Sequence, residues 1–376
     1  MSKPLLIQVI PTLGGGGAER EVARVSRALN DRSPFEVEVC CLMGRGGFAD
    51  GLEKHGVKVV VLSDTKRSQY TNFSELIRYL RLRKPTIVHV HLLRWGAIAA
   101  KMAGVPVVFS SEHNWVPGRT TYEAVLGAMN AFCTDRIVGV AEAVSTQLKG
   151  WCGIPRNKVV TVANAIEMDG FADGFDEAEK RRELGIPFDC SIIGNIARLT
   201  GQKAQRYFID SAAIILERNA KCEFLIVGEG ELRAELEEYT RTLGVTEHVR
   251  FLGFRDDVRE IMRLLDVLCL SSIHEGTPIT LLEGMACEKP VVSTDVGGCR
   301  EVVVDGETGF LVQPRDPQAL AEALLRLVDD KDLAVRMGQA GLRRVREVYS
   351  EDANLSVLNN LYQAVMTEKH LVTEPK

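Results

Sequence analysis

Short, nearly continuous runs of Val, Ile and Leu alternate along the chain with longer stretches whose apolar residues recur every three or four positions. The short runs predict buried β-strands, and the longer stretches predict amphipathic helices. In the first half the strand-like runs are 5–11, 35–42, 57–62, 86–91, 105–110, 136–140 and 158–162, with helices between them such as 18–29, 72–83 and 142–150. Apolar strands that alternate with helices predict a parallel sheet covered on both faces.

The second half repeats this pattern. Its strand-like runs are 191–196, 223–227, 249–252, 267–270 and 290–294, and its helices include 203–218, 231–243 and 257–264. We therefore expect an α/β protein with two doubly wound, Rossmann-like domains. An acidic segment without periodicity, 164–177, predicts the boundary between the two domains. We therefore expect the first domain to comprise residues 1–168 and the second to comprise residues 169–350. Helices are expected at 317–328, 332–349 and 351–368, and we expect residues 351–376 to pack back across the domains.

Composition is typical of a globular protein of the cytoplasm. Of the 376 residues 45% are hydrophobic and 26% are charged. No apolar run approaches the ~18 residues of a membrane span, and the first residues predict a strand instead of a signal peptide. Nine cysteines without a C-x-x-C pair argue against a disulfide framework or a zinc site. We expect buried thiols at Cys40, Cys41, Cys222 and Cys269 in a reducing compartment.

Charge is distributed unevenly between the two halves. Residues 1–170 contain 21 Lys and Arg against 15 Asp and Glu, whereas residues 171–376 contain 25 against 36. The basic half suits phosphate groups or an anionic membrane surface. Nucleic acid is not an expected partner, because the basic residues are not interleaved with aromatic ones and the net charge is -5.

Four consecutive glycines, Gly14 to Gly17, separate the first predicted strand from the first predicted helix. Glycine lets a backbone approach a ligand closely, and a helix N-terminus favours phosphate. A Rossmann dinucleotide fingerprint fits badly, since Glu19 occupies the place of its last glycine and the second strand ends in Cys40 and Cys41. A tight turn needs only one or two glycines. The run of four favours a loop that approaches a phosphate or a sugar.

Two cations follow the first predicted strand of the second domain. Arg198 and Lys203 lie five residues apart across a Thr–Gly turn and can bind one anion, the former as a planar fork and the latter as a point charge. The alternative is a pair of solvated surface cations. Their place at the carboxyl end of a parallel strand favours binding, because open α/β sheets bind ligands there.

A histidine also lies at the carboxyl end of a predicted strand in the first domain. His113 lies in segment 110–114, after the fifth predicted strand. It is a candidate hydrogen-bond donor or acid–base group near neutral pH. The alternative is an ordinary surface histidine.

Segment 271–292 carries two carboxylates, Glu275 in a predicted loop and Glu283 on a short apolar helix at 279–287. The start of that helix offers free N–H groups and the positive end of the helix dipole, which suit phosphate. The carboxylates suit the hydroxyl groups of a sugar or ribose. The spacing alone does not distinguish sugar or ribose binding from a structural interpretation, in which both acids cap and solvate the helix.

Taken together, these motifs resemble the signature of family 4 retaining glycosyltransferases, which have the GT-B fold. The resemblance runs from Ile7 to about Tyr349 and depends on the joint order of motifs that are weak alone. The matching motifs are Gly16-Gly17-Ala18-Glu19, Arg198 with Lys203, Val227 to Gly230, Glu275 to Ala286, Pro290 to Val292, Gly297-Gly298 with Glu301, and Asp305 to Val312. The resemblance implies two Rossmann-like domains facing a central cleft that holds a sugar donor.

The resemblance also implies a role for each matched residue. Arg198 and Lys203 would bind the donor diphosphate, Glu283 the nucleotide ribose, and Glu275 the sugar or the reacting centre. With His113, which would contact the sugar, the residues Glu275, Arg198 and Lys203 are the expected catalytic set. Further donor contacts would come from the backbone at Gly16, Gly17, Gly228, Gly276, Thr277, Pro278 and Ile279.

The expected donor is a nucleotide-diphosphate sugar, UDP-linked in preference to GDP-linked. No metal or other cofactor is expected, because Arg198, Lys203 and the helix dipole would neutralise the leaving diphosphate. The diphosphate itself would act as base for the acceptor hydroxyl. The single D-x-D motif, Asp330 to Asp332, is expected to cap a helix. Two carboxylates alone would also suit glycoside hydrolysis, against which the paired cations and glycine loops argue.

Three positions depart from the family pattern. Ala165 replaces a glycine at the domain junction and so disfavours a left-handed turn there. Ala204 replaces a glycine after Lys203, which we expect to be a mild change. Thr277 stands where a bulkier residue is common and would alter the floor of the sugar pocket.

The acceptor side offers one candidate feature, the segment 72–85. It places Arg78, Arg81, Arg83 and Lys84 beside apolar residues. This pattern predicts either an amphipathic helix that rests on an anionic membrane, near a lipid-linked acceptor, or a solvated helix that covers the sheet.

The expected function is that of a cytoplasmic glycosyltransferase, peripheral at the inner membrane face if the membrane interpretation holds. Its acceptor would be a glycan or a lipid-linked intermediate of polysaccharide biosynthesis. The alternatives are a GT-B-fold sugar-nucleotide epimerase or hydrolase, and a catalytically silent sugar-nucleotide-binding protein. The intact set of Arg198, Lys203, Glu275 and Glu283 argues against the silent protein.

Overall fold

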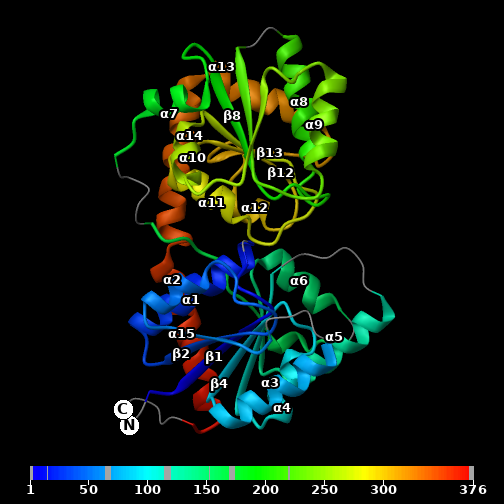
Figure 1. Cartoon of the computed structure of the whole chain (residues 1–376), viewed down its shortest axis with the longest axis vertical. Coiled ribbons are helices and arrows are strands. Elements are labelled where there is room, and N and C mark those ends of the chain that lie inside the picture. Colours follow the sequence, from blue (N-terminus) through cyan, green and yellow to red (C-terminus); the bar gives the residue numbers. More distant parts are fainter. Residues whose placement is uncertain are drawn as a thin grey trace. The chain divides into compact units, whose positions relative to one another are not determined.

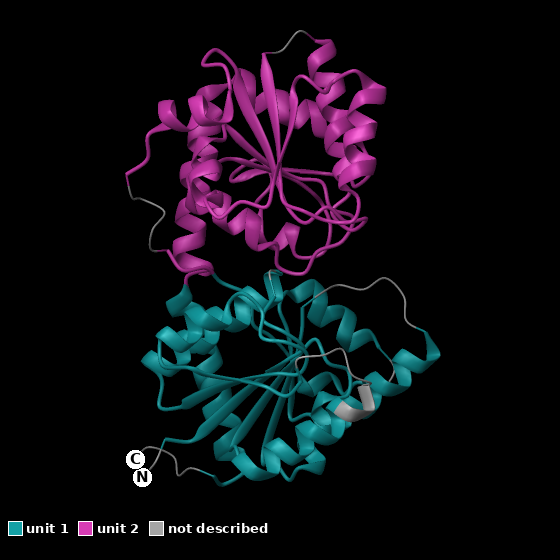
Figure 2. Ribbon diagram, in the orientation of Figure 1, with its two compact units in different colours: residues 1–165, 351–376 teal, residues 166–350 magenta. Residues whose placement is uncertain are grey.

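The chain forms two compact units (Figure 2). The computed structural model describes residues 3–14, 16–63, 69–113, 120–151, 153–168, 174–218 and 221–371, with the backbone alone for residues 69–71. Unit 1 comprises residues 1–165 and 351–376, and unit 2 comprises residues 166–350. Each unit is built on a parallel sheet with helices packed on its faces (Figure 1). The predicted class, with two Rossmann-like domains, is confirmed.

Unit 1 has a seven-stranded sheet in the order β3-β2-β1-β4-β5-β6-β7. Its strands are β1 (Leu5–Ile10), β2 (Glu36–Cys41), β3 (Lys58–Val61), β4 (Ile87–His91), β5 (Val107–Glu112), β6 (Arg136–Gly139) and β7 (Val159–Thr161). Its helices are α1 (Gly17–Arg32), α2 (Ala49–Lys54), α3 (Gln69–Arg83), α4 (Gly96–Met102), α5 (Thr121–Cys133), α6 (Glu142–Gly150), the 3₁₀ turn η1 (Arg156–Lys158) and α15 (Glu351–Glu368).

The C-terminal helix α15 belongs to the core of unit 1. Its Tyr362 is fully buried and makes edge-to-face contacts with Phe35 and Phe109, at ring-centroid distances of 5.8 and 4.9 Å. Each such aromatic pair contributes about 1 kcal/mol beyond the burial of its area. At the start of the helix Glu351 forms an ion pair with Arg24 of α1 at 3.2 Å. The last helix of the chain therefore completes the unit that the first helix begins.

Unit 2 has a six-stranded sheet in the order β10-β9-β8-β11-β12-β13. Its strands are β8 (Ser191–Ile196), β9 (Cys222–Val227), β10 (Val249–Gly253), β11 (Val267–Leu270), β12 (Val291–Thr294) and β13 (Gly309–Val312). Its helices are α7 (Glu177–Leu184), α8 (Gln205–Glu217), α9 (Arg233–Leu243), α10 (Val258–Leu264), α11 (Ile279–Ala286), α12 (Cys299–Val302), α13 (Pro317–Asp329) and α14 (Lys331–Val348).

In both sheets the order of strand addition reverses at the first strand of the unit. β1 lies between β2 and β4, and β8 lies between β9 and β11. Connections on the two sides of such a point leave in opposite directions, which opens the crevice where doubly wound sheets bind ligands. In unit 2 the loops at this point follow β8 and β11, and they carry Arg198 and Glu275.

All the predicted strands and helices are present, with ends that agree within three residues. β5 continues to Glu112, so segment 110–112 is strand, and His113 follows it directly. The helix predicted from residue 203 begins at Gln205, because Ala204 has a left-handed φ of +50° that a helix cannot contain. The elements that were not predicted are α2, α4, α5, η1, α7, α12 and β13. Apart from α5 and α7, each of them has seven residues or fewer.

The structure also bears on the expectations for Asp330, for the cysteines and for membrane-spanning segments. Asp330 caps α14, since its carboxylate accepts a hydrogen bond from the Leu333 amide at 2.9 Å. The thiols of Cys40, Cys41, Cys222 and Cys269 are buried, and every cysteine in the described part of the chain is free. Among the described helices, none has both the length and the apolar character needed to cross a membrane.

Candidate functional site

Lys203 and Glu275 form an ion pair at the point where strand order reverses in unit 2. Lys203 Nζ lies 2.5 Å from Glu275 Oε1, and the Ser272 hydroxyl donates to the same oxygen at 2.5 Å. The Glu275 side chain is 6% exposed and that of Lys203 is 23% exposed. The alternative of two solvated cations is therefore wrong for Lys203. The capping alternative is wrong for Glu275, because its carboxylate bonds to these two side chains.

Arg198 lies on the same loop as Lys203 and is exposed. Among the described residues, none forms an ion pair or hydrogen bond with its guanidinium group. The structure thus brings Lys203 to Glu275 and leaves Arg198 open to solvent. A planar fork with five N–H donors remains available there for an oxyanion.

Hydrogen bonds tie the loop after β8 to the loop after β11. The Ile273 amide donates to Gln202 O, and Gln202 Nε2 donates to His274 O, both at 2.9 Å. The Ser271 hydroxyl donates to Lys203 O at 3.0 Å. Because three bonds span the two loops, the position of Lys203 against Glu275 is fixed by the backbone as well as by charge.

Gly297, in the loop after β12, packs against the backbone of Glu275. A Cβ on Gly297 would lie 2.0 Å from Glu275 O, and its φ of +48° also favours glycine. Gly297, the first glycine of the Gly297–Gly298 pair in the family pattern, is therefore required by the packing of the loop. It lets the β12 loop reach the loop that carries Glu275.

Gly228 and Gly230 support the loop that carries Arg198. Gly228 has a φ of +133°, and a Cβ there would lie 2.2 Å from Ala197 O. A Cβ on Gly230 would lie 2.2 Å from Leu199 O. Gly228 was predicted to contact a ligand, and the structure places it against the residue before Arg198.

Helix α11 begins at Ile279, directly after Pro278, and carries Glu283. Pro278 is buried, Gly276 is buried, and Thr277 and Glu283 are half-buried. Helix α14 packs behind α11, where a Cβ on Gly338 would lie 1.9 Å from Glu288 O. The close approach of α14 fixes the helix on which Glu283 stands.

The glycine loop of unit 1 leads into α1. Gly16 is the N-cap residue and Gly17 is exposed, whereas Gly15 lies outside the described residues. Gly46, with a φ of +74°, packs on the residue before this loop, since a Cβ there would lie 2.1 Å from Leu13 O. A second glycine-bearing loop therefore supports the first, which the sequence did not reveal.

His113 is buried, and the surface-histidine alternative is wrong. Its Nε2 lies 2.9 Å from Nδ1 of His91, and burial lowers the pKa of His113 to about 4. His113 is therefore neutral at pH 7. His89 and His91 were not predicted as site residues, although they occupy alternate positions of the apolar strand β4. That alternation was the available signal, because residues two apart on a strand share one face.

Two family models match the chain, one almost wholly within unit 1 and the other within unit 2. "Glycosyltransferase Family 4" matches residues 15–169, and "Glycosyl transferases group 1" matches residues 176–344. The chain belongs to the family 4 glycosyltransferases. In this glycosyltransferase, Gly16, Gly17 and His113 lie within the first match, and Arg198, Lys203, Glu275 and Glu283 lie within the second.

Curated relatives of this glycosyltransferase come from several organisms. A putative glycosyltransferase of Bacillus subtilis, EpsD, is 29% identical over 298 residues, covering 74% of this chain and 77% of the relative. An Escherichia coli enzyme named UDP-Gal:alpha-D-GlcNAc-diphosphoundecaprenol alpha-1,3-galactosyltransferase is 29% identical over 273 residues, covering 69% of this chain and 70% of the relative.

Solved structures share the GT-B fold of this glycosyltransferase. HepE of Anabaena, solved in complex with UDP and glucose, superposes with a TM-score of 0.85 at 19% identity, covering 97% of this chain and 100% of that one. A glycosyltransferase of Rickettsia africae gives a TM-score of 0.84 at 19% identity, with 97% and 99% coverage. At these identities the likeness is one of fold.

Proposed function

We propose that this glycosyltransferase moves a sugar from a UDP-sugar to a hydroxyl group of a glycan or lipid-linked acceptor, with retention of anomeric configuration. The name of the E. coli relative combines a UDP-sugar donor with a diphosphoundecaprenol-linked acceptor. HepE, which has the same fold, was solved with UDP. Both observations favour UDP as the nucleotide.

The observation that carries the proposal is the arrangement of Arg198, Lys203 and Glu275. An exposed guanidinium group and an ammonium group lie on one loop, at the reversal point of the sheet. Lys203 has three N–H donors and gives one of them to Glu275, so two remain for a phosphate oxygen. Two cations on one loop suit the two phosphates of a nucleotide diphosphate, and the carboxylate between loops suits a sugar hydroxyl.

The proposal assigns the remaining residues the roles that the family resemblance implies. Glu283, on α11, is assigned to the ribose hydroxyls. Gly276, Thr277 and Ile279 offer backbone amides beside the first turn of α11, where the helix dipole stabilises negative charge. Pro278 has no amide hydrogen and fixes the entry into the helix.

In this proposal the reaction needs no metal ion. As the bond from sugar to diphosphate breaks, negative charge grows on the leaving phosphate, and Arg198, Lys203 and the α11 dipole stabilise it. The departing phosphate oxygen then takes the proton of the acceptor hydroxyl as that hydroxyl attacks the same face of the sugar. Glu275 is held by Lys203 and orients the sugar.

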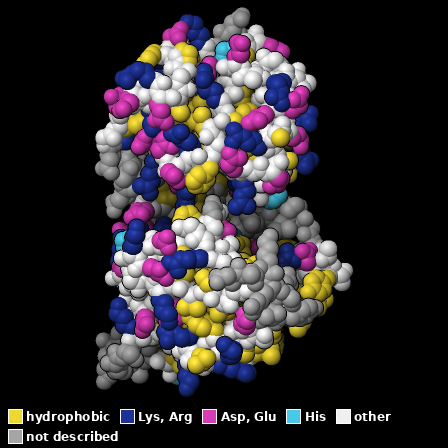
Figure 3. All heavy atoms as spheres, viewed as in Figure 1, with side chains coloured by type: hydrophobic (Ala, Val, Ile, Leu, Met, Phe, Trp, Pro, Cys, Tyr) yellow, Lys and Arg dark blue, Asp and Glu magenta, His cyan; other side chains and the backbone are white. Residues whose placement is uncertain are grey.

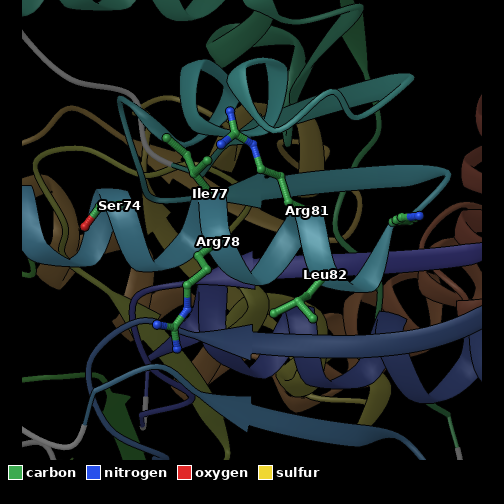
Figure 4. A pocket seen from close by; sticks show the side chains of 6 residues that line it. Ser74, Ile77, Arg78, Arg81 and Leu82 are labelled. Atoms are coloured by element: carbon green, nitrogen blue, oxygen red, sulfur yellow. The ribbon is translucent and has the colours of Figure 1, made fainter.

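We further propose that unit 1 approaches its acceptor at an anionic lipid surface. The inner face of α3 is buried through Leu76 and Leu80, as expected for a helix that covers the sheet. Its outer face bears exposed Arg78 and Arg81 beside a Leu82 that is 74% exposed, and an exposed Lys84 directly follows the helix. Figure 4 shows Arg78 and Leu82 leaving one side of α3 and Arg81 leaving the other.

The neighbouring helices extend this outer face with apolar side chains. α4 packs against both α3 and α5. One face of α5 exposes large apolar side chains at three- and four-residue spacing, namely Tyr122, Val125, Met129 and Phe132. Figure 3 shows hydrophobic side chains exposed on unit 1 beside Lys and Arg. Apolar groups with a basic margin suit insertion at an anionic membrane surface.

One cation of segment 72–85 does not take part in this surface. Arg83 is engaged with the buried carboxylate of Glu38, which also accepts a hydrogen bond from Tyr79 at 2.7 Å. These bonds, with Lys58, lower the pKa of Glu38 against the opposing effect of burial. Arg83 is therefore a structural residue that joins α3 to β2.

The donor assignment is tested by thermal shift with UDP, GDP, ADP and their sugar conjugates. A ligand that binds only the folded protein stabilises it by about 2.7 kcal/mol at a hundred times its dissociation constant. UDP and UDP-sugars should raise the melting temperature more than the other nucleotides. A larger shift with GDP or ADP would overturn the choice of base.

The reaction is tested with the preferred UDP-sugar, with and without a diphosphoundecaprenol-linked sugar as acceptor. Acceptor-dependent release of UDP and a product with the donor's anomeric configuration are expected. Release of free sugar without acceptor would indicate a hydrolase, and a changed sugar on UDP would indicate an epimerase. Binding without any turnover would indicate a silent binding protein.

The lipid surface is tested separately by flotation with vesicles of phosphatidylglycerol and phosphatidylcholine at low salt. The wild-type protein should float with the anionic vesicles, and the triple variant Arg78→Glu/Arg81→Glu/Lys84→Glu should remain at the bottom. Equal flotation of both proteins would exclude α3 as the contact. No binding of the wild-type protein would exclude the membrane proposal.

A further inference from the structure

Unit 1 buries a row of polar side chains between its sheet and α15. Gln8 of β1 is aligned with His89 of β4, and His91 is aligned with Ser111 of β5. Aligned residues on neighbouring parallel strands share one face, so these side chains point to the same layer. Gln8, His89, His91 and His113 are each at most 7% exposed. Three imidazoles in one buried layer are unusual, because burial disfavours the charged form of histidine.

The hydrogen bonds of this row set the position of each ring proton. His91 Nε2 lies 2.7 Å from Gln8 Oε1. A carbonyl oxygen only accepts, so His91 carries its proton on Nε2 and offers a lone pair at Nδ1. That Nδ1 lies 2.9 Å from Nε2 of His113, which must therefore be the donor. His113 is left with an unprotonated Nδ1.

Burial keeps the row neutral, which the assignment requires. It lowers the pKa of His91 well below its usual range and that of His113 to about 4. A neutral imidazole has one donor and one acceptor, and the bond made by one nitrogen decides the state of the other. The Gln8 oxygen therefore determines the tautomer of His91, and the tautomer of His91 determines that of His113.

Two atoms of the row have no hydrogen-bond partner among the described residues, although both are buried. They are His113 Nδ1 and Gln8 Nε2. Both residues line a small cavity of about 30 Å³, to which Glu21 and Asn354 also contribute. This space holds about two water molecules at most, so it admits a hydroxyl group but no sugar ring. A buried acceptor beside such a space is suited to receive a hydroxyl hydrogen.

We propose that Gln8 and His91 are positioning residues that hold His113 protonated at Nε2, so that its Nδ1 accepts a hydrogen bond from a substrate hydroxyl group. The identity of that hydroxyl rests on the proposed function, whereas the tautomer of His113 does not. Substrates that lack the hydroxyl, or that present only an acceptor at its place, would be selected against. His113 is thus a specificity contact. Gln8, acting through His91, determines which of its ring nitrogens carries the proton.

His89 provides an internal comparison. Its Nδ1 lies 2.6 Å from the Tyr362 hydroxyl and its Nε2 lies 2.7 Å from the Ser111 hydroxyl, so both of its nitrogens are satisfied. Its ring lies beside that of His91, with centroids 4.3 Å apart. The hydrogen bonds of His89 go to Tyr362 and Ser111, and not to Gln8, His91 or His113. Tyr362→Phe removes the hydrogen bond to His89, and with it a contact with Gln8, but it leaves both hydrogen-bonding atoms of His91 and their partners in place.

The tautomer is read directly by long-range ¹H–¹⁵N correlation NMR on the full chain labelled with ¹⁵N-histidine. The chain has 7 histidines, and a His113→Asn variant identifies the signals of His113. A proton on Nε2 of His113 is expected in the wild-type protein. A proton on Nδ1 would overturn the proposal, and it is the result that the reversed Gln8 amide would give.

Two substitutions at His91 separate positioning from packing. His91→Asn can place its amide oxygen near the former Nδ1 and accept from His113, so it should keep the wild-type tautomer. His91→Leu removes the acceptor and should give a mixture of both tautomers. An unchanged tautomer in a folded His91→Leu protein would overturn the role of His91. If that variant does not fold, Gln8→Leu tests the same row one residue further back.

Kinetics with the UDP-sugar identified above supply the functional arm. His91→Leu should lower kcat/KM about tenfold, whereas His91→Asn and Tyr362→Phe should remain within about threefold of wild type. Equal loss in His91→Leu and His91→Asn, with the tautomer preserved in the latter, would show that His91 acts only through packing. If no UDP-sugar is turned over, the proposed function fails and the NMR result still decides the tautomer.

Discussion

Gly297 lies so close to the backbone of Glu275 that a Cβ on residue 297 would be 2.0 Å from the Glu275 carbonyl oxygen. Packed atoms do not tolerate that separation, so Gly297→Ala must displace the loop that holds Glu275 against Lys203. We expect this variant to lose at least about tenfold in kcat/KM, because small displacements of a positioned group are costly. Steady-state kinetics and circular dichroism together check the loss of activity and the retention of the fold.

Gly306→Ala is the matched control for that variant. Gly306 has a φ of +77°, so alanine meets similar backbone strain, but no atom lies within 4 Å of its Cβ position. It should retain nearly full activity. Equal losses in the two variants would mean that strain, and not displacement of Glu275, lowers the activity of Gly297→Ala.

The Lys203–Glu275 pair predicts a non-additive effect on stability. Lys203→Met leaves a nearly buried carboxylate without its cation and should lower the free energy of unfolding by about 2 kcal/mol. This loss is smaller than that expected for a fully buried pair, because Lys203 is partly exposed to solvent. Lys203→Met/Glu275→Gln should recover most of this loss but remain inactive. Urea unfolding and kinetics provide the two measurements. A double variant as unstable as Lys203→Met would contradict the pairing.

Arg198 predicts the opposite combination of effects. Because its side chain is exposed and its guanidinium group forms no ion pair or hydrogen bond with the described residues, Arg198→Ala should leave the melting temperature of the protein without ligand unchanged. It should weaken UDP binding at least about tenfold, as expected for the loss of a charge-assisted contact to phosphate. Isothermal titration with UDP measures this. Arg336→Ala, at an exposed position on α14, is the control and should bind UDP normally.

Ala204 predicts a stabilising substitution. It holds a φ of +50° at the N-cap of α8, a conformation that costs an L-residue about 1 kcal/mol or more. Ala204→Gly should therefore raise the free energy of unfolding by up to about 1 kcal/mol, the larger backbone entropy of glycine in the unfolded chain limiting the gain. Ala213→Gly, inside the same helix, should lower it by about 1 kcal/mol. Thermal unfolding of both variants checks the contrast in sign.

The buried histidines predict acid sensitivity. Burial lowers the pKa of His89 to about 3 and that of His113 to about 4, whereas an unfolded chain titrates near 6.5. Between about pH 6.5 and 4 the unfolded chain binds protons that the folded protein refuses, so the free energy of unfolding falls as pH falls, by up to about 1.4 kcal/mol per pH unit for each histidine. Urea unfolding at pH 7, 6 and 5 measures the slope. His89→Gln should reduce it, and an unchanged slope would contradict this origin.

The fold could be predicted from the sequence because strands apolar on both faces have few alternatives to a parallel sheet. Contacts between distant residues could not be predicted in this way. Lys203 and Glu275 were both assigned to ligand binding, but their mutual ion pair depends on β8 and β11 being neighbours in the sheet. That adjacency is a property of strand order, which the spacing of residues along the chain does not contain.

The same limit explains two further outcomes. Ala204 was expected to be a mild replacement of glycine, yet the φ angle it must adopt is visible only in the folded loop. The role of His113 was expected from a single histidine after a strand, but its surroundings come from three strands and α15. His89 and His91 carried a readable signal in their alternation, since polar residues in an apolar strand require partners.

The return of α15 to unit 1 has a consequence for protein synthesis. The first 165 residues emerge from the ribosome with all seven strands of their sheet, but Phe35 and Phe109 must wait for Tyr362 to close the core around them. Unit 2 is continuous in the chain and has its whole sheet by residue 312. Unit 1 is therefore the first unit to be synthesised, but its folding can be completed only after unit 2 and α15 have been translated.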